Sequence, residues 1–332
     1  MAMTRAKRTP DDPFLRYTRM TQHAVLNVLG VPVRFESNAA WLLRLAEEAY
    51  GGLPACEPTS NGHLLVRLLA NDDATASVTH APVPNVYADE HVVNAIFTAS
   101  DAAVCALAAG SALVMVSPTM RAFPYHVRYE MIEFACYRLA SHHLHAVGLH
   151  AACVVINNRA WLIFGESGAG KSTLTFACMR HGWDLIAEDS AFVLPRDSNN
   201  DAMEVRGVPT FMHLLDDTLR FFPNVQMKSH LITRRSGAAK HEIDVRATFK
   251  RPMRVSAPLA GVIFLEARRD SPEPKIRRLT PLAARQRLIR SQPFAPNYAR
   301  WPDALAHMIE LPAYVLAPGG DIELNVDVVE RL

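Results

Sequence analysis

The stretch GESGAGKS at residues 165–172 constrains the fold of this chain more than any other feature. It fits the pattern G-x-x-x-x-G-K-[ST], which binds phosphate only where it leaves a strand and opens a helix. Residues 160–164 before it are apolar enough for a strand, and residues 172–179 after it suit a helix that Gly182 ends. The motif therefore stands in the context that it requires, and it predicts an α/β fold.

The flanking sequence extends this unit on both sides. Residues 151–156 predict a second strand, and Asn157-Asn158 favour a tight hairpin because asparagine tolerates positive φ. Residues 183–187 predict a further strand after the helix. Strand, loop, helix and strand in close succession make a βαβ unit, whose right-handed crossover leaves its strands parallel.

A loop of this kind holds the phosphates of a nucleotide. Its glycines let backbone N–H groups and the helix N-terminus face phosphate oxygens, while Lys171 spans the β- and γ-phosphates and Ser172 binds Mg²⁺. The sequence contains no N-K-x-D stretch for guanine recognition and no L-S-G-G-Q stretch of transport ATPases. Their absence weakens the GTPase and transport ATPase interpretations and leaves ATP hydrolysis open. The predicted nucleotide-binding residues are Gly165, Glu166, Ser167, Gly168, Ala169, Gly170, Lys171, Ser172 and Thr173.

Two adjacent carboxylates, Glu188 and Asp189, end the predicted strand at 183–187. The carboxyl ends of parallel strands share one edge of a sheet, so we expect both acids to return close to the phosphates. A carboxylate there holds Mg²⁺ or accepts the proton of an attacking hydroxyl. We assign Asp189 chiefly as the base and Glu188 chiefly to the metal. Alternation along a strand leaves room for one of them to serve neither role, and two solvated acids at a turn are the alternative.

Composition narrows the class of protein. A net charge of +2 gives no global field for nucleic acid. Five scattered cysteines without C-x-x-C fit a reducing compartment, so we expect a cytoplasmic protein with buried, free thiols. The uncharged stretch 102–120 nominally reaches membrane-spanning length, but Gly110, Ser111 and Pro118 interrupt it. We therefore expect no membrane span.

Three segments are expected along the chain. Residues 1–24 are polar without an apolar signal-peptide core, and they predict a flexible tail. Residues 25–125 predict a small α/β domain, in which Asn38 caps the start of a helix and Gly51 its end. Residues 126–332 predict the catalytic domain, opened by a helix at 126–145.

The motif set resembles a known family. Residues 149–195, with His150, the G-x-S-G-x-G-K-S loop and the acid pair, resemble the catalytic domain of HPr kinase/phosphorylase. In that family a histidine of an H-G pair, the loop lysine and serine, and an Asp-Asp pair make the site. His150, Lys171, Ser172, Glu188 and Asp189 fall on those places, and the resemblance implies ATP, Mg²⁺ and Asp189 as general base.

This sequence departs from the family at two places. Its acid pair is Glu-Asp, which alters the geometry offered to a metal, and His150 is followed by Ala151. The stretch Glu204-Val-Arg206-Gly207 is similar to the family's E-I-R-G stretch, where the glutamate is linked to Mg²⁺. The resemblance therefore implies Glu204 as a third metal residue, with a plain charge at a strand edge as the alternative.

The N-terminal half looks more like the HPr-kinase homologues of lasso-peptide biosynthesis. Two stretches carry this likeness, at 28–52 and 123–152. It implies a peptide or protein serine as acceptor, specifically the last serine of a precursor peptide, with the N-terminal domain binding the acceptor or mediating homo-oligomer assembly. A protein kinase acting on HPr, a small-molecule hydroxyl kinase and a non-catalytic nucleotide sensor stay open as alternatives.

Two further groups of residues suggest a functional role, and each also has a simpler structural interpretation. His142, His143, His145 and His150 invite a metal site, but no cysteine or acid lies at ligand spacing, and a core histidine is the alternative for His150. Arg234, Arg235 and Lys240 form a basic loop that could reach the γ-phosphate or an acidic peptide, with a solvated surface loop as the alternative.

Overall fold

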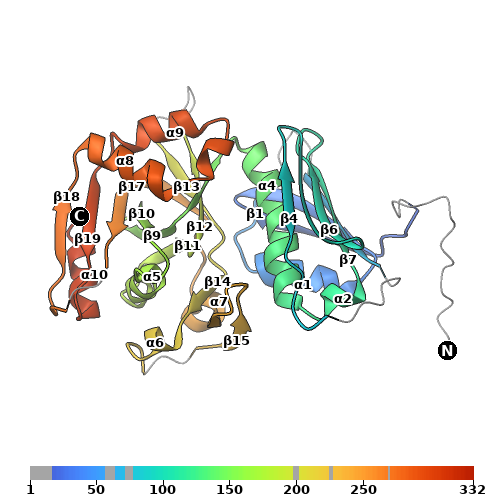
Figure 1. Cartoon of the computed structure of the whole chain (residues 1–332), viewed down its shortest axis with the longest axis horizontal. Helices are drawn as coiled ribbons and strands as arrows, with labels where there is room; N and C mark the ends of the chain where they lie inside the picture. The colour runs from blue at the N-terminus through green and yellow to red at the C-terminus, as the bar shows by residue number, and fades with distance from the viewer. Residues whose placement is uncertain (1–16, 57–63, 72–77, 197–201, 224–226, 268–269) are drawn as a thin grey trace.

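A computed structural model describes residues 17–56, 64–71, 78–196, 202–223, 227–267 and 270–332. The fold is mixed α/β, with two bodies side by side and a small third sheet beneath their junction (Figure 1). The first strand begins at Gln22, inside the segment expected as a tail, and residues 1–16 lie outside the described residues.

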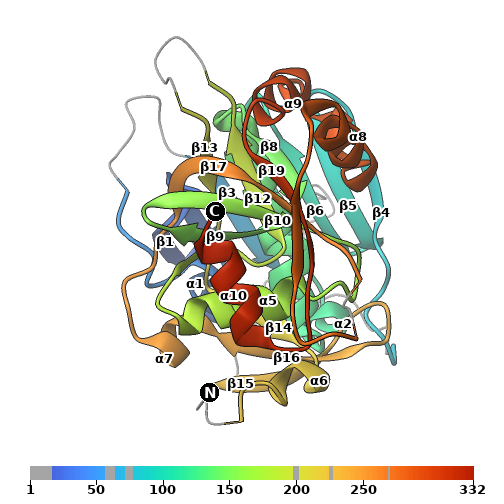
Figure 2. The ribbon, with the colours of Figure 1, turned by 90° about the vertical axis from the view of Figure 1, so that its left-hand side faces the viewer.

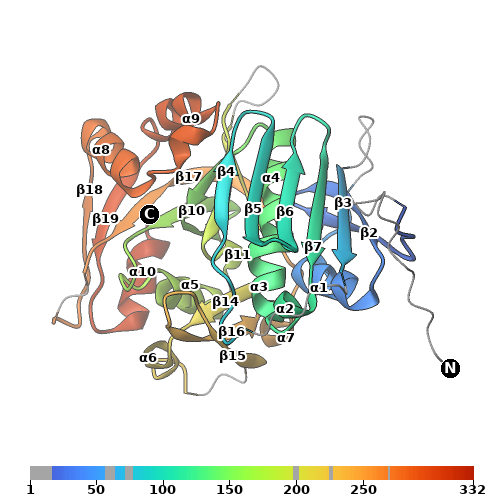
Figure 3. The ribbon, with the colours of Figure 1, turned by 45° about the vertical axis from the view of Figure 1, so that its right-hand side comes forward.

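The first body is built on a seven-stranded sheet in the order β1-β2-β3-β7-β6-β5-β4. Helices α1 and α4 pack against one face of it, and Figure 3 shows α4 behind the strands. The strands are β1 (Gln22–Val28), β2 (Val31–Ser37), β3 (Leu64–Ala70), β4 (Asn85–Ala88), β5 (Val92–Thr98), β6 (Asp101–Ala106) and β7 (Ser111–Val116).

The long helical stretch after this sheet belongs to the same core. It runs through α2 (Pro118–Arg121), α3 (Pro124–His126), a π-helical turn (Val127–Ile132) and α4 (Glu133–His143). Its apolar side chains, such as Met131 and Leu139, are buried with the first sheet. The helix that the sequence placed at the head of the catalytic domain thus packs in the first core, which ends near Ala146.

Helix α1 (Ala40–Tyr50) forms where the sequence predicts it, but Asn38 does not cap it. The Asn38 side chain instead pairs with both backbone groups of Ala70, at 2.8 and 2.9 Å, and so ties the helix entry to β3. Gly51 ends the helix as expected.

The second body is built on a nine-stranded sheet with the path β11-β9-β10-β17-β13-β12-β8, extended by β19 and β18 beside β17. Its strands are β8 (Val147–His150), β9 (Ala152–Ile156), β10 (Arg159–Phe164), β11 (Asp184–Ala187), β12 (Ser190–Leu194), β13 (Glu204–Arg206), β17 (Ser256–Leu265), β18 (Lys275–Arg278) and β19 (Ala313–Ala317).

Helices cover the second body. Figure 2 shows α10 beside α5 on one side of the strands, with α8 and α9 at the top. The helices are α5 (Lys171–Arg180), α8 (Pro281–Ser291), a short 3₁₀ turn (Ala295–Asn297), α9 (Trp301–Met308) and α10 (Ile322–Glu330).

The expected strand–loop–helix–strand unit is confirmed. Asn157 and Asn158 adopt φ of 50° and 63° in the turn between β9 and β10. Strands β10 and β11 both pair antiparallel with β9, so they run in the same direction with β9 between them. Their carboxyl ends therefore reach the same edge of the sheet.

The third sheet has three strands in the order β14-β16-β15. They are β14 (Phe211–Leu214), β15 (Ser229–Thr233) and β16 (Ala239–Asp244), and the short helices α6 (Asp216–Leu219) and α7 (Val245–Phe249) flank them. Arginines join this region to the first body: Arg246 donates to the carbonyl of Gly51 at 2.5 Å, and Arg128 pairs with Glu242.

Two expectations from the sequence, buried free thiols and no membrane span, can be compared with the described part of the chain. Cys105, Cys136, Cys153 and Cys178 are buried, free thiols, and Cys56 is half-buried. Within the described ranges, no helix is both long and apolar enough to cross a membrane, and residues 102–120 form β6, β7 and α2.

Candidate active site

The glycine-rich loop at 165–172 joins β10 to α5. Gly170 has φ of 94° at the helix start and Gly168 has φ of 83°, a region in which a side chain would be strained. The first intrahelical bond runs from Leu174 N to Gly170 O, so the N–H groups of residues 171–173 have no acceptor within the helix and can face a ligand. The loop thus has the geometry of an anion-binding helix N-terminus.

Lys171 lies folded over this loop. Its Nζ donates to the carbonyl of Gly165 at 2.6 Å and lies 3.4 Å from that of Glu166. Burial lowers the pKa of Lys171, and the nearby charges of Asp189 and Glu188 partly offset that effect. A desolvated ammonium group at this place interacts strongly with any phosphate that displaces its carbonyl partners.

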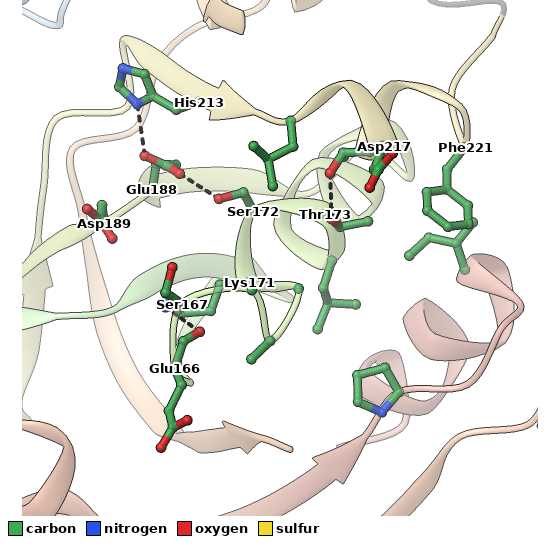
Figure 4. Close-up of a pocket in the computed structure, with 18 of the residues that line it drawn as sticks. Glu166, Ser167, Lys171, Ser172, Thr173, Glu188, Asp189, His213, Asp217 and Phe221 are labelled. Carbon is green, nitrogen blue, oxygen red and sulfur yellow. Dashed lines mark hydrogen bonds and ion pairs between the residues drawn. The ribbon is translucent and has the colours of Figure 1, made fainter. Parts of the chain in front are cut away.

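Glu188 lies between the loop serine and a histidine from the third sheet (Figure 4). Ser172 Oγ donates to Glu188 Oε1 at 2.6 Å, and His213 Nδ1 lies 3.2 Å from Oε2. Burial alone raises the pKa of Glu188, but the hydrogen bonds and charge of His213 and the Ser172 hydroxyl bring it to about 2. The carboxylate is therefore held ionised beside the hydroxyl expected to bind metal.

Asp189 faces a different pair of residues. Its Oδ1 lies 3.1 Å from His150 Nδ1, and its Oδ2 lies 3.8 Å from Arg234 Nη2. Glu188 and Asp189 stand in the turn after β11 rather than within the strand, so alternation does not separate them, and both line one cavity. Both acids therefore line the cavity, and the orientation of neither excludes it from a role there.

His150 ends β8 next to the start of β12, where it pairs with Ser190. Its side chain is 58% exposed, so it is not a core histidine. Its backbone is fixed on both sides by Gln292, which accepts from His150 N at 2.8 Å and donates to its carbonyl at 3.2 Å. The imidazole is thus held over Asp189 while it stays open to solvent.

The basic loop divides between two places. Arg234 and Lys240 line the same cavity as the acids, whereas Arg235 pairs with Glu130 and donates to the carbonyl of Ala81 at 3.0 Å. Arg234 is only half-buried but firmly held, because it donates to the hydroxyls of Tyr125 at 2.9 Å and Tyr129 at 3.4 Å. It is a positioned cation rather than a solvated one.

A buried row of charges leads from the cavity into the first body. His213 Nε2 lies 3.1 Å from Glu242 Oε1, Glu242 pairs with Arg128, and Arg128 Nη1 donates to Glu133 at 2.7 Å. Burial lowers the pKa of His213, but its hydrogen bonds to the two glutamates outweigh this effect and raise it. A protonated imidazole donates from both nitrogens, so it bridges the two carboxylates.

Sequence reasoning missed this row. His213 stands in the apolar run FMHLL and Glu242 in the loop-like stretch KHEID, so neither belongs to a motif. A single histidine inside this apolar run was the one signal, and a short apolar run predicts a strand rather than a site.

Glu204 does not lie with the other candidate residues. It pairs with Leu194 in register, four residues along β12 from Ser190, which is roughly 13 Å along the strand. Its carboxylate is 3.1 Å from Arg206 Nη2, and Arg206 donates to the carbonyl of Leu29 at 3.0 Å. Glu204 and Arg206 thus form an ion pair at the contact with the first body, away from the cavity.

The cavity has a volume of about 390 Å³, within the range of small-ligand sites. Its polar end holds the loop, both acids, His213, Arg234 and Lys240, and Phe221 stands at its other end (Figure 4). Leu215, Pro318 and Ile322 add apolar side chains to the lining, and Asp217 lies beside Phe221 (Figure 4). The arrangement suits a ligand with phosphates at one end and a flat apolar group at the other.

The oxygen donors present fit Mg²⁺. Ser172 Oγ and Glu188 supply a hydroxyl and an ionised carboxylate side by side, and Mg²⁺ is usually held by one or two carboxylates together with substrate phosphates. Among the described residues, no group of three or more His, Cys, Asp or Glu side chains could hold a metal ion by itself. The histidines at 142–145 accordingly form no such group.

Comparisons with known proteins give little beyond this geometry. No family model matches the sequence, and no curated protein matches it. Among solved structures, the HPr(Ser) kinase/phosphatase from Coxiella burnetii is similar with a TM-score of 0.29 and 17% identity, over 56% of this chain and 92% of that one. Any conclusion about activity must therefore come from the site itself.

Proposed function

We propose that this protein is an ATP-dependent kinase that transfers the γ-phosphoryl group to a serine hydroxyl of a peptide or protein. One observation carries the proposal: the glycine-rich loop, the Ser172–Glu188 pair and the Asp189–His150 pair surround a single cavity. The resemblance of the sequence implies the acceptor, the C-terminal serine of a lasso-peptide precursor.

The phosphates of ATP lie along the loop and the first turn of α5, where N–H groups and Lys171 face them. The base and ribose lie towards Phe221 and Ile322. Ser172 and Glu188 would hold Mg²⁺, which neutralises phosphate charge when it is bound.

The acceptor serine approaches the γ-phosphorus on the side of Asp189. Its hydroxyl proton passes to Asp189 as the serine oxygen forms a bond to phosphorus, and the bond between phosphorus and the β-phosphate oxygen breaks to release ADP. Arg234 and Lys171 stabilise the negative charge on the transferred group. His150 holds the Asp189 carboxylate in place through Oδ1, while Arg234 lies near Oδ2.

Mass spectrometry of acceptors incubated with the protein, Mg²⁺ and ATP tests this reaction. The acceptors are a lasso-precursor peptide, HPr and small hydroxyl compounds, and we expect one added phosphoryl group on the peptide serine with the wild type. Asp189→Asn should lower the transfer rate about 10³-fold with ATP affinity kept, since general bases contribute roughly 10²- to 10⁴-fold. Lys171→Ala should lose both.

A matched control is Asp184→Asn, at the opposite end of β11, where the carboxylate lies 3.9 Å from Arg254. It should leave transfer unchanged. ATP binding without transfer to any acceptor would reject the kinase and favour a nucleotide sensor. Transfer confined to small hydroxyl compounds would reject the peptide acceptor.

A further inference from the structure

Strand β15 forms the outer edge of the three-stranded sheet. Within the described part of the chain, the order β14-β16-β15 gives it a neighbouring strand on one side only. Four of its five residues are exposed, and Leu231 at its centre is 62% exposed. An exposed edge of this kind is a template for one more strand.

The register shows which backbone groups point outward. Asp244 N donates to Lys228 O at 3.0 Å and Arg234 N donates to Ala238 O at 2.9 Å, at the two ends of the β15–β16 pairing. Residues in hydrogen-bonded pairs alternate along an antiparallel ladder, so His230 and Ile232 also bond to β16. The N–H and C=O groups of Ser229, Leu231 and Thr233 therefore point away from the sheet.

A groove of about 1210 Å³ borders this strand. Its lining includes residues 228–235 of the hairpin, residues 79–81 and exposed Val83, and it extends over Glu242 and Asp244 of β16 and Phe211 of β14. Small-molecule sites usually occupy about 300 to 1,000 Å³. The groove is therefore larger than a small acceptor needs, and it suits a polypeptide segment.

The groove leads to the catalytic cavity. Arg234 directly follows β15, lines both the groove and the cavity, and lies 3.8 Å from Asp189. Arg234 therefore connects the end of β15 with the proposed base, and a chain laid along β15 would run towards that end. Continuity with the site distinguishes this edge from β4, the exposed edge of the first sheet.

The charged side chains that line the groove also indicate which kind of peptide would bind there. Lysine and arginine side chains that line the groove outnumber the acidic ones; the cations are Arg128, Lys228, Arg234, Arg235 and Arg246, and the anions are Glu48, Glu242 and Asp244. Ion pairs within the groove join Arg128 to Glu242 and Arg246 to Asp244, so Glu48 is the one remaining lining acid against Lys228, Arg234 and Arg235. His80, His126 and His230 line it as well. An acceptor segment with more acids than bases is the complementary partner.

We propose that the edge of β15 binds the acceptor peptide in an extended conformation, as a fourth strand that leads its serine to Asp189. This inference rests on the kinase function proposed above and adds the place and chemistry of acceptor binding. Main-chain hydrogen bonds to residues 229, 231 and 233 supply affinity, and Leu231 and Val83 supply contacts for apolar side chains of the peptide.

The test compares Leu231→Pro with Leu231→Val. Proline removes the outward N–H and leaves the ladder to β16 intact, because residue 231 does not donate to β16. Valine keeps the N–H and a strand-forming side chain. Two acceptors are used: a degenerate, acid-rich peptide library with one fixed serine in each peptide, and N-acetylserine amide, which is too short to reach β15.

We expect Leu231→Pro to lower kcat/KM for the library about tenfold relative to Leu231→Val, with most of the change in KM. Transfer to N-acetylserine amide and ATP affinity should be the same in both variants. An equal loss on both acceptors, or no difference between the variants, would overturn the acceptor groove while leaving the kinase in place. Failure of the wild type on both acceptors would reject the kinase function and this site with it.

Size-exclusion chromatography separates one more outcome. If Leu231→Pro alters the oligomeric state and leaves the library's kcat/KM unchanged, the edge pairs with a second copy of the chain, and the inference is wrong. An unchanged elution volume together with the selective loss on the library would support peptide binding.

Discussion

The site combines two regions that are built in different ways. The loop at 165–172 and the acids Glu188 and Asp189 come from one short βαβ unit, in which each group follows from its neighbours in the chain. The row from His213 through Glu242 to Arg128 joins residues more than a hundred positions apart in sequence. Local sequence places the reacting groups, and long-range contacts hold them.

The two regions also differ in how far each one depends on having all of its residues present. The loop works through backbone N–H groups together with Lys171 and Ser172, and its glycines supply the positive φ that the turn requires. The charged row is buried, and a buried charge without its partner is costly, so each member stabilises the protein only while its neighbours are present. We therefore expect the loop to tolerate changes in its surroundings better than the row does.

The largest effect that sharpens this comparison should come from Arg234. Arg234→Gln keeps a polar side chain, although a shorter one, and removes the charge beside Asp189. We expect transfer to fall about 10²- to 10³-fold, as for the loss of one group that stabilises transition-state charge. Steady-state kinetics with an unphosphorylated acceptor peptide that the wild type phosphorylates would measure it.

The adjacent Arg235→Gln is the matched control, because Arg235 faces Glu130 and the carbonyl of Ala81 instead of the cavity. It should change kcat by less than about threefold, since exposed ion pairs contribute little. Equal losses in the two variants would show that the loop acts only as a structural joint.

His213→Gln should lower the free energy of unfolding by about 2 to 3 kcal/mol, because it leaves Glu188 without its charged partner. Chemical denaturation at pH 6 would measure this change. In the double variant with Glu188→Gln, we expect the two losses to be less than additive, since the residues are in contact. Strictly additive losses of unfolding free energy would show that His213 and Glu188 are not coupled, and that the two regions are independent.

The stability difference between wild type and His213→Gln should depend on pH. The pKa of His213 is raised, so its contribution is full below 6.5 and is lost as pH rises through its folded value. The pKa of Glu188 is lowered from 4.5 to about 2, so its contribution is lost only as pH falls through that window. The difference should be largest between pH 4.5 and 6.5 and shrink above it, and a difference that grows with pH would contradict the assignment.

The smallest effect should come from Glu204→Gln. The carboxylate lies with Arg206 at the contact between the bodies, so we expect less than about a threefold change in transfer and no change in Mg²⁺ dependence. Titration of transfer against Mg²⁺ concentration would check it. A raised Mg²⁺ requirement would restore Glu204 to the metal site that the E-V-R-G stretch suggested.

Much of the second body follows from its sequence. The hairpin at Asn157-Asn158, helix α5 and its end at Gly182, and strand β11 lie where the pattern of glycine, asparagine and apolar residues predicts them. The failures share one cause. Asn38 bonds across to Ala70 instead of capping its own helix, and the helix at 133–143 packs on the first sheet instead of opening the second body, because tertiary contacts outweigh local preference at both places.

The strand–loop–helix unit and the return of Glu188 and Asp189 to its edge can be predicted from the residues alone, because backbone connectivity fixes both. The groups that meet these acids come from distant parts of the chain and depend on its packing: His213 lies at Glu188 and Arg234 at Asp189, whereas Glu204 lies away from the cavity. Those side chains carry no local signal, since their partners are chosen by how sheets and helices pack, and packing depends on the whole chain.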